Sequence, residues 1–219
     1  MESVTKNRDA PAGFAPYADI RAEGYVVLAS LLGQPPSEGL RGILQNLQWD
    51  EAIPQQVDQA LTALRQACQD YPLADMKEEF DRLFVGLGCG EMIPYASWYR
   101  KKKMQSLPLV PLRSDLVRLK IVKQSDYHET EDHAAALCEV MAIITAKTNG
   151  RSYGTQADFF QQHIAPWMGS FFKDLQSAKS AGFYRAVGLF GLCFLEFEGQ
   201  YLQCRLNTIP NQKRRRKAR

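Results

Sequence analysis

The sequence is short of the residues that most often build metal and catalytic sites. Its 219 residues include three histidines, with no His-x3-His pair, and five cysteines, with no Cys-x-x-Cys motif. These spacings exclude the common zinc sites. An odd number of cysteines also argues against a disulfide framework and favours reduced thiols in a cytoplasmic protein. We therefore expect neither a metal nor another cofactor.

Long apolar runs are missing too, as is the alternating pattern of β-strands. No stretch of about 18 uninterrupted apolar residues occurs, so we expect no membrane span. The first residues lack the basic region and apolar run of a secretory signal. The glycine-rich run Gly86–Gly90 lacks the Gly-Lys-Ser/Thr ending of a phosphate-binding loop and follows a helical pattern. Apolar residues instead recur at helical spacing, which predicts an all-α protein.

The net charge of +3 does not describe the body of the protein. Residues 213–219 hold six of the 27 basic residues, and the rest of the chain has 21 basic against 24 acidic residues. Basic residues are thus concentrated in a tail, and we expect no dedicated nucleic-acid site. We predict a disordered N-terminus over 1–14, one helical domain over 15–204 and a disordered basic tail over 205–219.

The periodic segments predict a bundle of about nine helices in two subdomains. Ser37 and Thr130 are suitable helix caps, and Pro54 and Pro72 suit first turns. A basic, proline-containing segment over 100–111 is expected to be an exposed connector between the subdomains. The predicted helices cover about 17–32, 37–47, 54–69, 72–87, 112–123, 130–148, 155–163, 166–175 and 181–202.

The most unusual stretch runs from Glu78 to Tyr99. It opens as an amphipathic helix that carries Phe84, continues through the glycine run and ends in Pro-Tyr-Ala-Ser-Trp-Tyr, residues 94–99, which we call the aromatic motif. Runs of glycine disfavour helix and permit left-handed turns, so we expect a hinge there. Three aromatic side chains within five residues suggest a binding platform, although packing in the core is their more usual role.

A second stretch supplies the candidate charged side chains. Residues 129–133, Glu-Thr-Glu-Asp-His, open a helical pattern, and we call them the acidic motif. Thr130 is expected to cap that helix, with Glu131 and Asp132 in its first turn, where negative charge is favourable. Asp132 and His133 would most simply form a helix-start ion pair, but a carboxylate beside a histidine is also half of many catalytic sets.

Two classes of function stay open on these residues alone. The first is a binding module that uses the aromatic motif and the acidic motif. The second is a nucleotide-binding protein or a small helical hydrolase that uses Asp132 and His133. No serine or cysteine nucleophile in a recognisable motif accompanies that pair.

Together the two motifs resemble the signatures of the TorD/DmsD family, cytoplasmic maturation chaperones of molybdenum-cofactor oxidoreductases. The first signature is an aromatic-x-x-Leu-Phe core, here residues 80–84, then a glycine-containing loop and Pro-Tyr-x-Ser-x-Tyr, here the aromatic motif. The second is Glu-x-x-Asp-His at a helix start, here the acidic motif, followed by Leu-Cys-Glu-Val-Met at 137–141. The segments Trp167–Phe172 and Gly182–Tyr184 also resemble this family's C-terminal helices, so the similarity covers about residues 20–203.

The resemblance implies a TorD-like helical fold and a chaperone that is not an enzyme. It also implies binding of the twin-arginine signal peptide and the apo catalytic subunit of a molybdoenzyme, such as a DMSO or TMAO reductase or a formate dehydrogenase. Export would be delayed until the cofactor is loaded. The implied signal-peptide and client site consists of Phe84, Pro94, Tyr95, Ser97, Trp98, Tyr99, Glu129, Asp132 and His133.

The chemistry of such a signal peptide, an Arg-Arg pair before an apolar stretch, suits both motifs. Glu129 and Asp132 are expected to pair with guanidinium groups. The aromatic motif and Phe84 would offer apolar and cation–π surface, and His133 would orient Asp132 or bond peptide backbone.

The family includes domain-swapped dimers, for which the connector over 100–111 is the expected place. Some members bind a guanine nucleotide, but hydrolysis is not expected without a GTPase loop.

Three features depart from the family pattern. Many members have proline where this chain has Thr130, which weakens the preset entry to the helix but supplies a cap. Glutamate is frequent where this chain has Ala96, so any role of that acid is absent. The basic tail is no part of the pattern, and its role, the client and the oligomeric state stay open.

Overall fold

The fold is all-α over the part of the chain that the structure describes. Among these residues the only strand-like pairing is an isolated antiparallel bridge, and none of the helices is long and apolar enough to span a membrane. The predicted disordered segment 1–14 and most of the predicted tail lie outside the described residues. This computed structural model describes residues 17–49, 53–86, 90–102, 109–123, 129–146 and 152–208.

Ten α-helices and two π-helical turns are present in these ranges, against about nine predicted. The additional helix begins at Ala96, within the aromatic motif, where the sequence pattern predicted no helix. The π-helical turns, Asp81–Val85 and Phe160–Ile164, directly continue the fourth and eighth helices. The helices are α1 (Tyr17–Gly33), α2 (Glu38–Asn46), α3 (Gln55–Asp70), α4 (Leu73–Phe80), α5 (Ala96–Lys102), α6 (Leu109–Leu119), α7 (Ala134–Thr145), α8 (Tyr153–Phe159), α9 (Met168–Ser177) and α10 (Phe183–Thr208).

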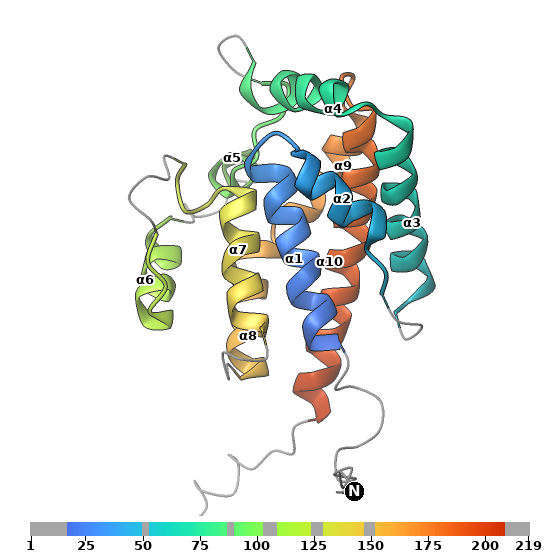
Figure 1. Cartoon of the computed structure of the whole chain (residues 1–219). Coiled ribbons are helices and arrows are strands. Elements are labelled where there is room, and N and C mark those ends of the chain that lie inside the picture. Colours follow the sequence, from blue (N-terminus) through green and yellow to red (C-terminus); the bar gives the residue numbers. More distant parts are fainter. Residues whose placement is uncertain are drawn as a thin grey trace, which may run out of the picture.

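The longest helix, α10, lies in the middle of the bundle, as its apolar sequence predicted (Figure 1). Helices α9 and α3 pack along α10, and α1 packs along α7. Helix α6 stands at the edge of the bundle on the side of α7 (Figure 1). The buried apolar side chains form one cluster that runs from α1 to α10, so the two predicted subdomains share a core.

A buried ion pair joins α1 to α10 inside this core. Arg21 donates to both carboxylate oxygens of Glu198, from Nε and Nη2, at 2.6 Å each. Its Nη2 also donates to Gln156 of α8 at 2.8 Å, and the guanidinium carbon lies 4.5 Å from the ring centroid of Tyr201. Buried charges are costly unless they are paired and hydrogen-bonded. The pair therefore fixes α1, α8 and α10 relative to one another.

The start of α7 differs from the prediction. Glu131 and Asp132 precede the helix instead of forming its first turn, and the cap is His133, not Thr130. The Nδ1 atom of His133 accepts a hydrogen bond from the backbone N–H of Ala135 at 3.1 Å. A neutral imidazole has an acceptor nitrogen that can fill the role of the usual Ser, Thr or Asp oxygen.

The predicted connector over 100–111 is helical at both ends. Residues 100–102 complete α5 and residues 109–111 begin α6, while those between lie outside the described chain. Pro111 falls in the first turn of α6, where the N–H that proline lacks would have no helical partner. The last helix likewise continues to Thr208, four residues into the predicted tail.

Two glycines turn the chain back onto the π-helical turn after α4. Gly86 has φ of 58°, in the region that favours glycine, and it ends the helix as predicted. At Gly90 a Cβ atom would lie 2.3 Å from the carbonyl oxygen of Leu83. The N–H of Met92 donates to that same oxygen at 2.7 Å. This close return leads the chain directly into the aromatic motif.

The N-terminus of α10 is capped by a side chain from α4. The buried carboxylate of Glu79 accepts hydrogen bonds from three consecutive backbone N–H groups, those of residues 182–184, at 2.9, 3.0 and 2.7 Å. The N–H groups at a helix start have no partner within the helix, and the helix dipole favours negative charge there. Glu79 therefore links the first half of the chain to its longest helix.

We expect Glu79→Ala to lower the free energy of unfolding by about 3 kcal/mol, because buried N–H groups lose their acceptor and α10 loses its capping charge. Chemical denaturation followed by far-UV circular dichroism measures this loss. The matched control is Glu78→Ala, which removes an exposed carboxylate paired with Arg82. It should cost less than about 1 kcal/mol. Equal losses in the two variants would contradict the capping role.

Candidate functional site

The two predicted motifs meet in space, although 29 residues separate them in the sequence. Tyr95 and His133 form the isolated antiparallel bridge, and the backbone N–H of Ala134 donates to the carbonyl of Pro94 at 2.8 Å. The ring centroids of Tyr95 and His133 lie 4.9 Å apart in an edge-to-face arrangement, with an interplanar angle of 74°. The structure therefore places the start of α5 against the start of α7.

Asp132 holds these two helix starts together. Its side chain is 0% exposed, and its Oδ2 accepts the backbone N–H of Ser97 at 2.8 Å. Its Oδ1 accepts the hydroxyl of Thr130 at 2.6 Å. Because Ser97 lies in the first turn of α5, Asp132 caps that helix from a distant part of the chain. Its carboxylate is not accessible to an arginine of another molecule in this conformation.

His133 is buried beside Asp132 and is neutral near pH 7. Burial lowers its pKa to about 4, and the nearby negative charge of Asp132 only partly opposes this effect. Its Nδ1 is occupied by the cap of α7, and both oxygens of Asp132 have other partners. The two side chains therefore serve two helix starts and do not form the catalytic dyad of the hydrolase alternative.

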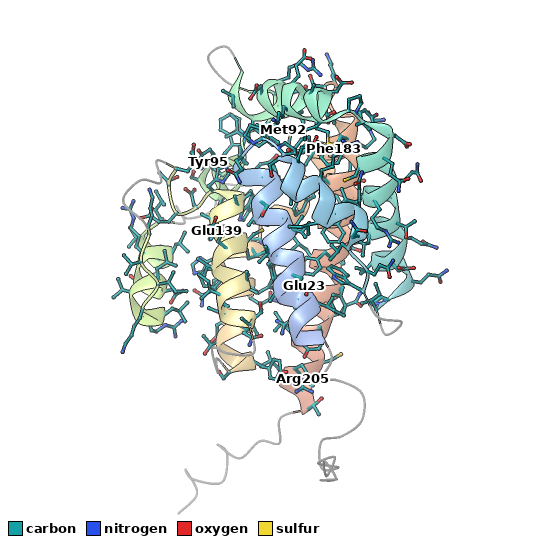
Figure 2. All side chains as sticks on the ribbon, in the orientation of Figure 1. Glu23, Met92, Tyr95, Glu139, Phe183 and Arg205 are labelled. Carbon is teal, nitrogen blue, oxygen red and sulfur yellow. The ribbon has the colours of Figure 1, made fainter. Side chains whose placement is uncertain are left out.

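The accessible side of the site consists of Tyr95, Trp98 and Glu129. Tyr95 is half-buried, and its hydroxyl donates to the exposed carboxylate of Glu129. Trp98 has 42% of its surface exposed, which is unusual for so large an aromatic residue. In Figure 2, Tyr95 lies near the N-terminal end of α7, and Glu139, which belongs to α7, lies below it. An aromatic surface thus adjoins an accessible carboxylate.

Other predicted site residues belong to the core. Tyr99 is buried against Trp167, with ring centroids 5.5 Å apart, and its hydroxyl donates to Asp174 at 2.9 Å. Phe84 is half-buried and packs on different rings, those of Phe80 and Tyr184, at centroid distances of 5.0 and 5.3 Å. Pro94 and Ser97 contribute backbone groups to the junction of α5 and α7. Pro94, Ser97 and Tyr99 therefore adjoin the accessible surface, whereas Phe84 packs in another part of the core.

A hollow of about 390 Å³, which the sequence did not indicate, opens beside the acidic motif. It lies between α6 and α7, and both Glu129 and Glu131 line it. Glu131 is held by a bidentate ion pair with Arg113 of α6, with both N–O distances at 3.0 Å. The apolar lining of the hollow comes from both helices and from the segment between them: Leu116, Ile121, Val122, Val140 and Ile143.

Metal binding and redox chemistry receive no support from the described residues. No group of three or more His, Cys, Asp or Glu side chains among them is arranged to hold a metal ion. Cys68 and Cys138 are buried free thiols, as predicted, and burial raises the pKa of the Cys68 thiol to about 11. These thiols therefore belong to the core.

The segment of the chain that contains both motifs matches a known protein family. The family model described as nitrate reductase delta subunit matches residues 50–173, which is more than half of the chain. This range includes the aromatic motif, the acidic motif and α6 between them. The similarity thus covers the residues that form the junction of α5 and α7.

Curated relatives extend the similarity over most of the chain. Chaperone protein TorD of Aliivibrio salmonicida is 26% identical over 203 residues, covering 83% of this chain and 94% of the relative. Chaperone protein TorD of Vibrio cholerae serotype O1 (El Tor Inaba N16961) is 26% identical over 196 residues, covering 80% and 89%. The relative of the same name from Histophilus somni is 25% identical over 141 residues, covering 63% and 71%.

We expect His133 to make the protein lose stability as the pH falls from about 6.5 to about 4. In the unfolded chain the imidazole takes up a proton near its ordinary pKa of 6.5, whereas in the folded protein it resists protonation until about pH 4. The unfolded state therefore binds more protons in this window, and the loss should approach about 3 kcal/mol at its lower end. Chemical denaturation at a series of pH values measures this dependence.

The control variant is His133→Asn, which keeps a capping acceptor at the start of α7 but has no titrating group. The difference in stability between wild type and variant should shrink or reverse as the pH is lowered through this window. Burial also lowers the pKa of His163, whose contribution remains in both proteins and cancels in the difference. Parallel stability curves for the two proteins would show that His133 is not responsible.

The capping role of Asp132 gives a separate expectation. Asp132→Asn keeps an oxygen for the N–H of Ser97 and should cost about 1 kcal/mol of unfolding free energy. Asp132→Ala leaves that N–H without its acceptor and should cost about 3 kcal/mol. Both values come from chemical denaturation at neutral pH. A loss in Asp132→Asn as large as in Asp132→Ala would show that the charge, and not the cap, is what matters.

Proposed function

Since this chain belongs to the nitrate reductase delta subunit family, as a relative of TorD chaperones, we propose that it binds the twin-arginine signal peptide and the apo catalytic subunit of a molybdoenzyme. Membership of this family makes the protein a molybdoenzyme maturation chaperone and not an enzyme. In the proposed mechanism, bound signal peptide is withheld from export while the cofactor is inserted into the client.

The observation that carries the proposal is the meeting of the two motifs around an accessible aromatic and acidic surface. A twin-arginine signal peptide presents guanidinium groups next to an apolar stretch. Glu129 is an exposed carboxylate suited to a guanidinium group, and Trp98 and Tyr95 present ring surface beside it. The hollow between α6 and α7 offers apolar lining at the same place.

The proposed roles within the predicted site differ according to burial. We assign direct contact with the peptide to Tyr95, Trp98 and Glu129. We assign positioning to Asp132 and His133, since one caps α5 and the other caps α7. Pro94 and Ser97 support these residues through backbone hydrogen bonds, and Tyr99 does so through its packing in the core. Phe84 packs against Tyr184 instead, and we assign it no role in this site.

Electrostatics favours a cationic peptide over a nucleotide at this place. The hollow is lined by Glu129, Glu131 and Glu139, and Lys123 is its one basic lining residue. Glu131 is already paired with Arg113. The remaining negative charge therefore comes from Glu129 and Glu139. These two carboxylates oppose the approach of phosphate groups and attract arginine side chains. We therefore keep nucleotide binding as the weaker alternative and propose a cytoplasmic protein that acts before export. Exchange of the connector over 100–111 in a domain-swapped dimer stays a prediction.

The test is co-purification of the tagged, full-length protein from its own host, with mass spectrometry of the captured proteins. We expect a molybdoenzyme precursor that still carries its twin-arginine leader, of the DMSO reductase, TMAO reductase or formate dehydrogenase type. The double variant Trp98→Ala, Glu129→Gln should recover at least about five-fold less precursor, because it removes an accessible anchor and its neighbouring charge.

A matched control keeps this result specific to the site. Glu196→Gln makes the same chemical change on an exposed residue of α10 and should recover as much precursor as wild type. Capture of mature subunits without leaders, or of no molybdoenzyme, would refute signal-peptide binding. Undiminished capture by the double variant would leave the function standing and refute the assignment of Trp98 and Glu129.

A further inference from the structure

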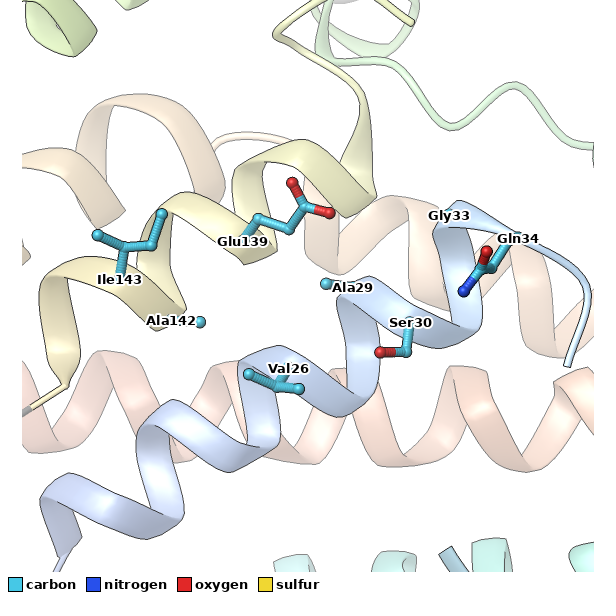
Figure 3. A pocket seen from close by; sticks show the side chains of 8 residues that line it. All are labelled: Val26, Ala29, Ser30, Gly33, Gln34, Glu139, Ala142 and Ile143. Atoms are coloured by element: carbon cyan, nitrogen blue, oxygen red, sulfur yellow. The ribbon is translucent and has the colours of Figure 1, made fainter. Parts of the chain in front are cut away.

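The outward face of α7 lies between two hollows. One is the hollow of about 390 Å³ between α6 and α7, and the other, of about 460 Å³, lies between α1 and α7. Glu139 and Ile143 line both hollows, so the two adjoin each other on α7. Figure 3 shows the second hollow, with side chains of α1 and its C-terminal end facing those of α7. We call the two hollows together the α7 groove.

The surface of the α7 groove is mainly apolar and partly open to solvent. Ile143 has 43% of its surface exposed, and Val26 on the facing side of α1 has 53%. Val122 is the most exposed of the large apolar residues on the α6 side. Clustered exposed apolar residues at a concave surface commonly mark a site of interaction. The volumes suit a peptide segment better than a whole folded domain.

Among the described residues, Glu139 is the acidic residue of the groove without an interaction partner. No hydrogen bond or ion pair within the described chain involves its carboxylate. The other two acids of the groove are engaged, Glu131 with Arg113 and Glu129 with the hydroxyl of Tyr95. Glu139 is exposed at the surface of the groove, and the side chains around it raise the pKa of its carboxyl by partial desolvation. A cationic ligand would relieve this cost.

We propose that the α7 groove binds the apolar stretch of the signal peptide and that Glu139 pairs with one of the peptide's arginines. This inference rests on the proposed function and extends its site along α7. Arginine is preferred to lysine because its guanidinium is weakly hydrated and meets a carboxylate through two parallel hydrogen bonds. The apolar side chains of Val26 and Ile143 then border the same pair.

The length of the groove fits such a peptide. The acidic motif lies at the N-terminal end of α7, and Ile143 lies nine residues beyond Ala134, the first residue of that helix. At 1.5 Å per residue this path is about 14 Å long. It accommodates about four extended residues or about nine helical ones, and the apolar stretch of a signal peptide has about 7–15 residues. A peptide held at Glu129 thus reaches Glu139 and Ile143.

The experiment measures binding of a fluorescent synthetic peptide to the full-length protein by anisotropy. The peptide contains Arg-Arg followed by about ten alanine and leucine residues. Two further peptides replace Arg-Arg by Gln-Gln, or the apolar residues by serine. Glu139→Gln should weaken binding of the first peptide about ten-fold, and should have little effect on the Gln-Gln peptide. Ile143→Ser should weaken the first peptide about five-fold, with little effect on the serine peptide.

Matched controls make the same chemical changes outside the groove. Glu196→Gln on α10 and Ile43→Ser on α2 alter exposed residues and should bind the first peptide as wild type does. Unchanged binding by Glu139→Gln and Ile143→Ser, together with weakened binding by Trp98→Ala, would overturn the groove and leave the proposed function intact. Failure of the wild type to bind the first peptide would overturn both proposals.

The α7 groove has two alternative occupants, the basic tail of this chain and a second copy of the protein. Measurements on the same protein samples distinguish them from the signal peptide. If removal of residues 209–219 strengthens peptide binding about as much as Glu139→Gln weakens it, the basic tail of this chain is the partner of Glu139, and the proposal fails. If the wild type forms a dimer in solution that Ile143→Ser dissociates, the groove binds a second copy, and the proposal fails. A monomer whose affinity for the peptide is independent of the tail supports it.

Discussion

The structure depends on how the first backbone N–H groups of its helices are satisfied. A helix start leaves N–H groups without partners in the helix itself, and burial makes such groups costly. In this protein two buried carboxylates supply the missing acceptors from remote parts of the chain: Glu79 for α10 and Asp132 for α5. Both residues lie in the stretches that make the sequence recognisable. The recognisable residues thus hold the fold together, and the surface that we propose for binding lies beside them.

Helix content was predictable from local periodicity, because the amphipathic pattern and the proline and serine starts depend on near neighbours. Ser37, for example, caps α2 as expected. The start of α7 was mispredicted because the rule for capping residues ranks threonine above histidine, whereas burial keeps His133 neutral and able to accept a hydrogen bond. The helix over the aromatic motif was missed because its capping acceptor, Asp132, is 35 residues from Ser97 in the sequence.

The sequence identified the two motifs that meet in the structure, but it did not indicate which of their side chains are exposed. The two motifs were expected to act together, and they do meet. Sequence alone did not distinguish Trp98, which is exposed, from Tyr99, which is buried one residue later, since this depends on where α9 packs. No local pattern in the sequence predicted the α7 groove. It forms where α7 lies between α1 and α6, and its central charge, Glu139, looks like any exposed glutamate in the sequence.

The buried pair of Arg21 and Glu198 also has a consequence for biosynthesis. The two residues lie 177 positions apart, so almost the whole domain must be translated before the guanidinium of Arg21 meets its counter-ion. Until then α1 carries a charge that cannot be buried without a large penalty. Stable packing of α1 into the core is therefore coupled to the synthesis of α10.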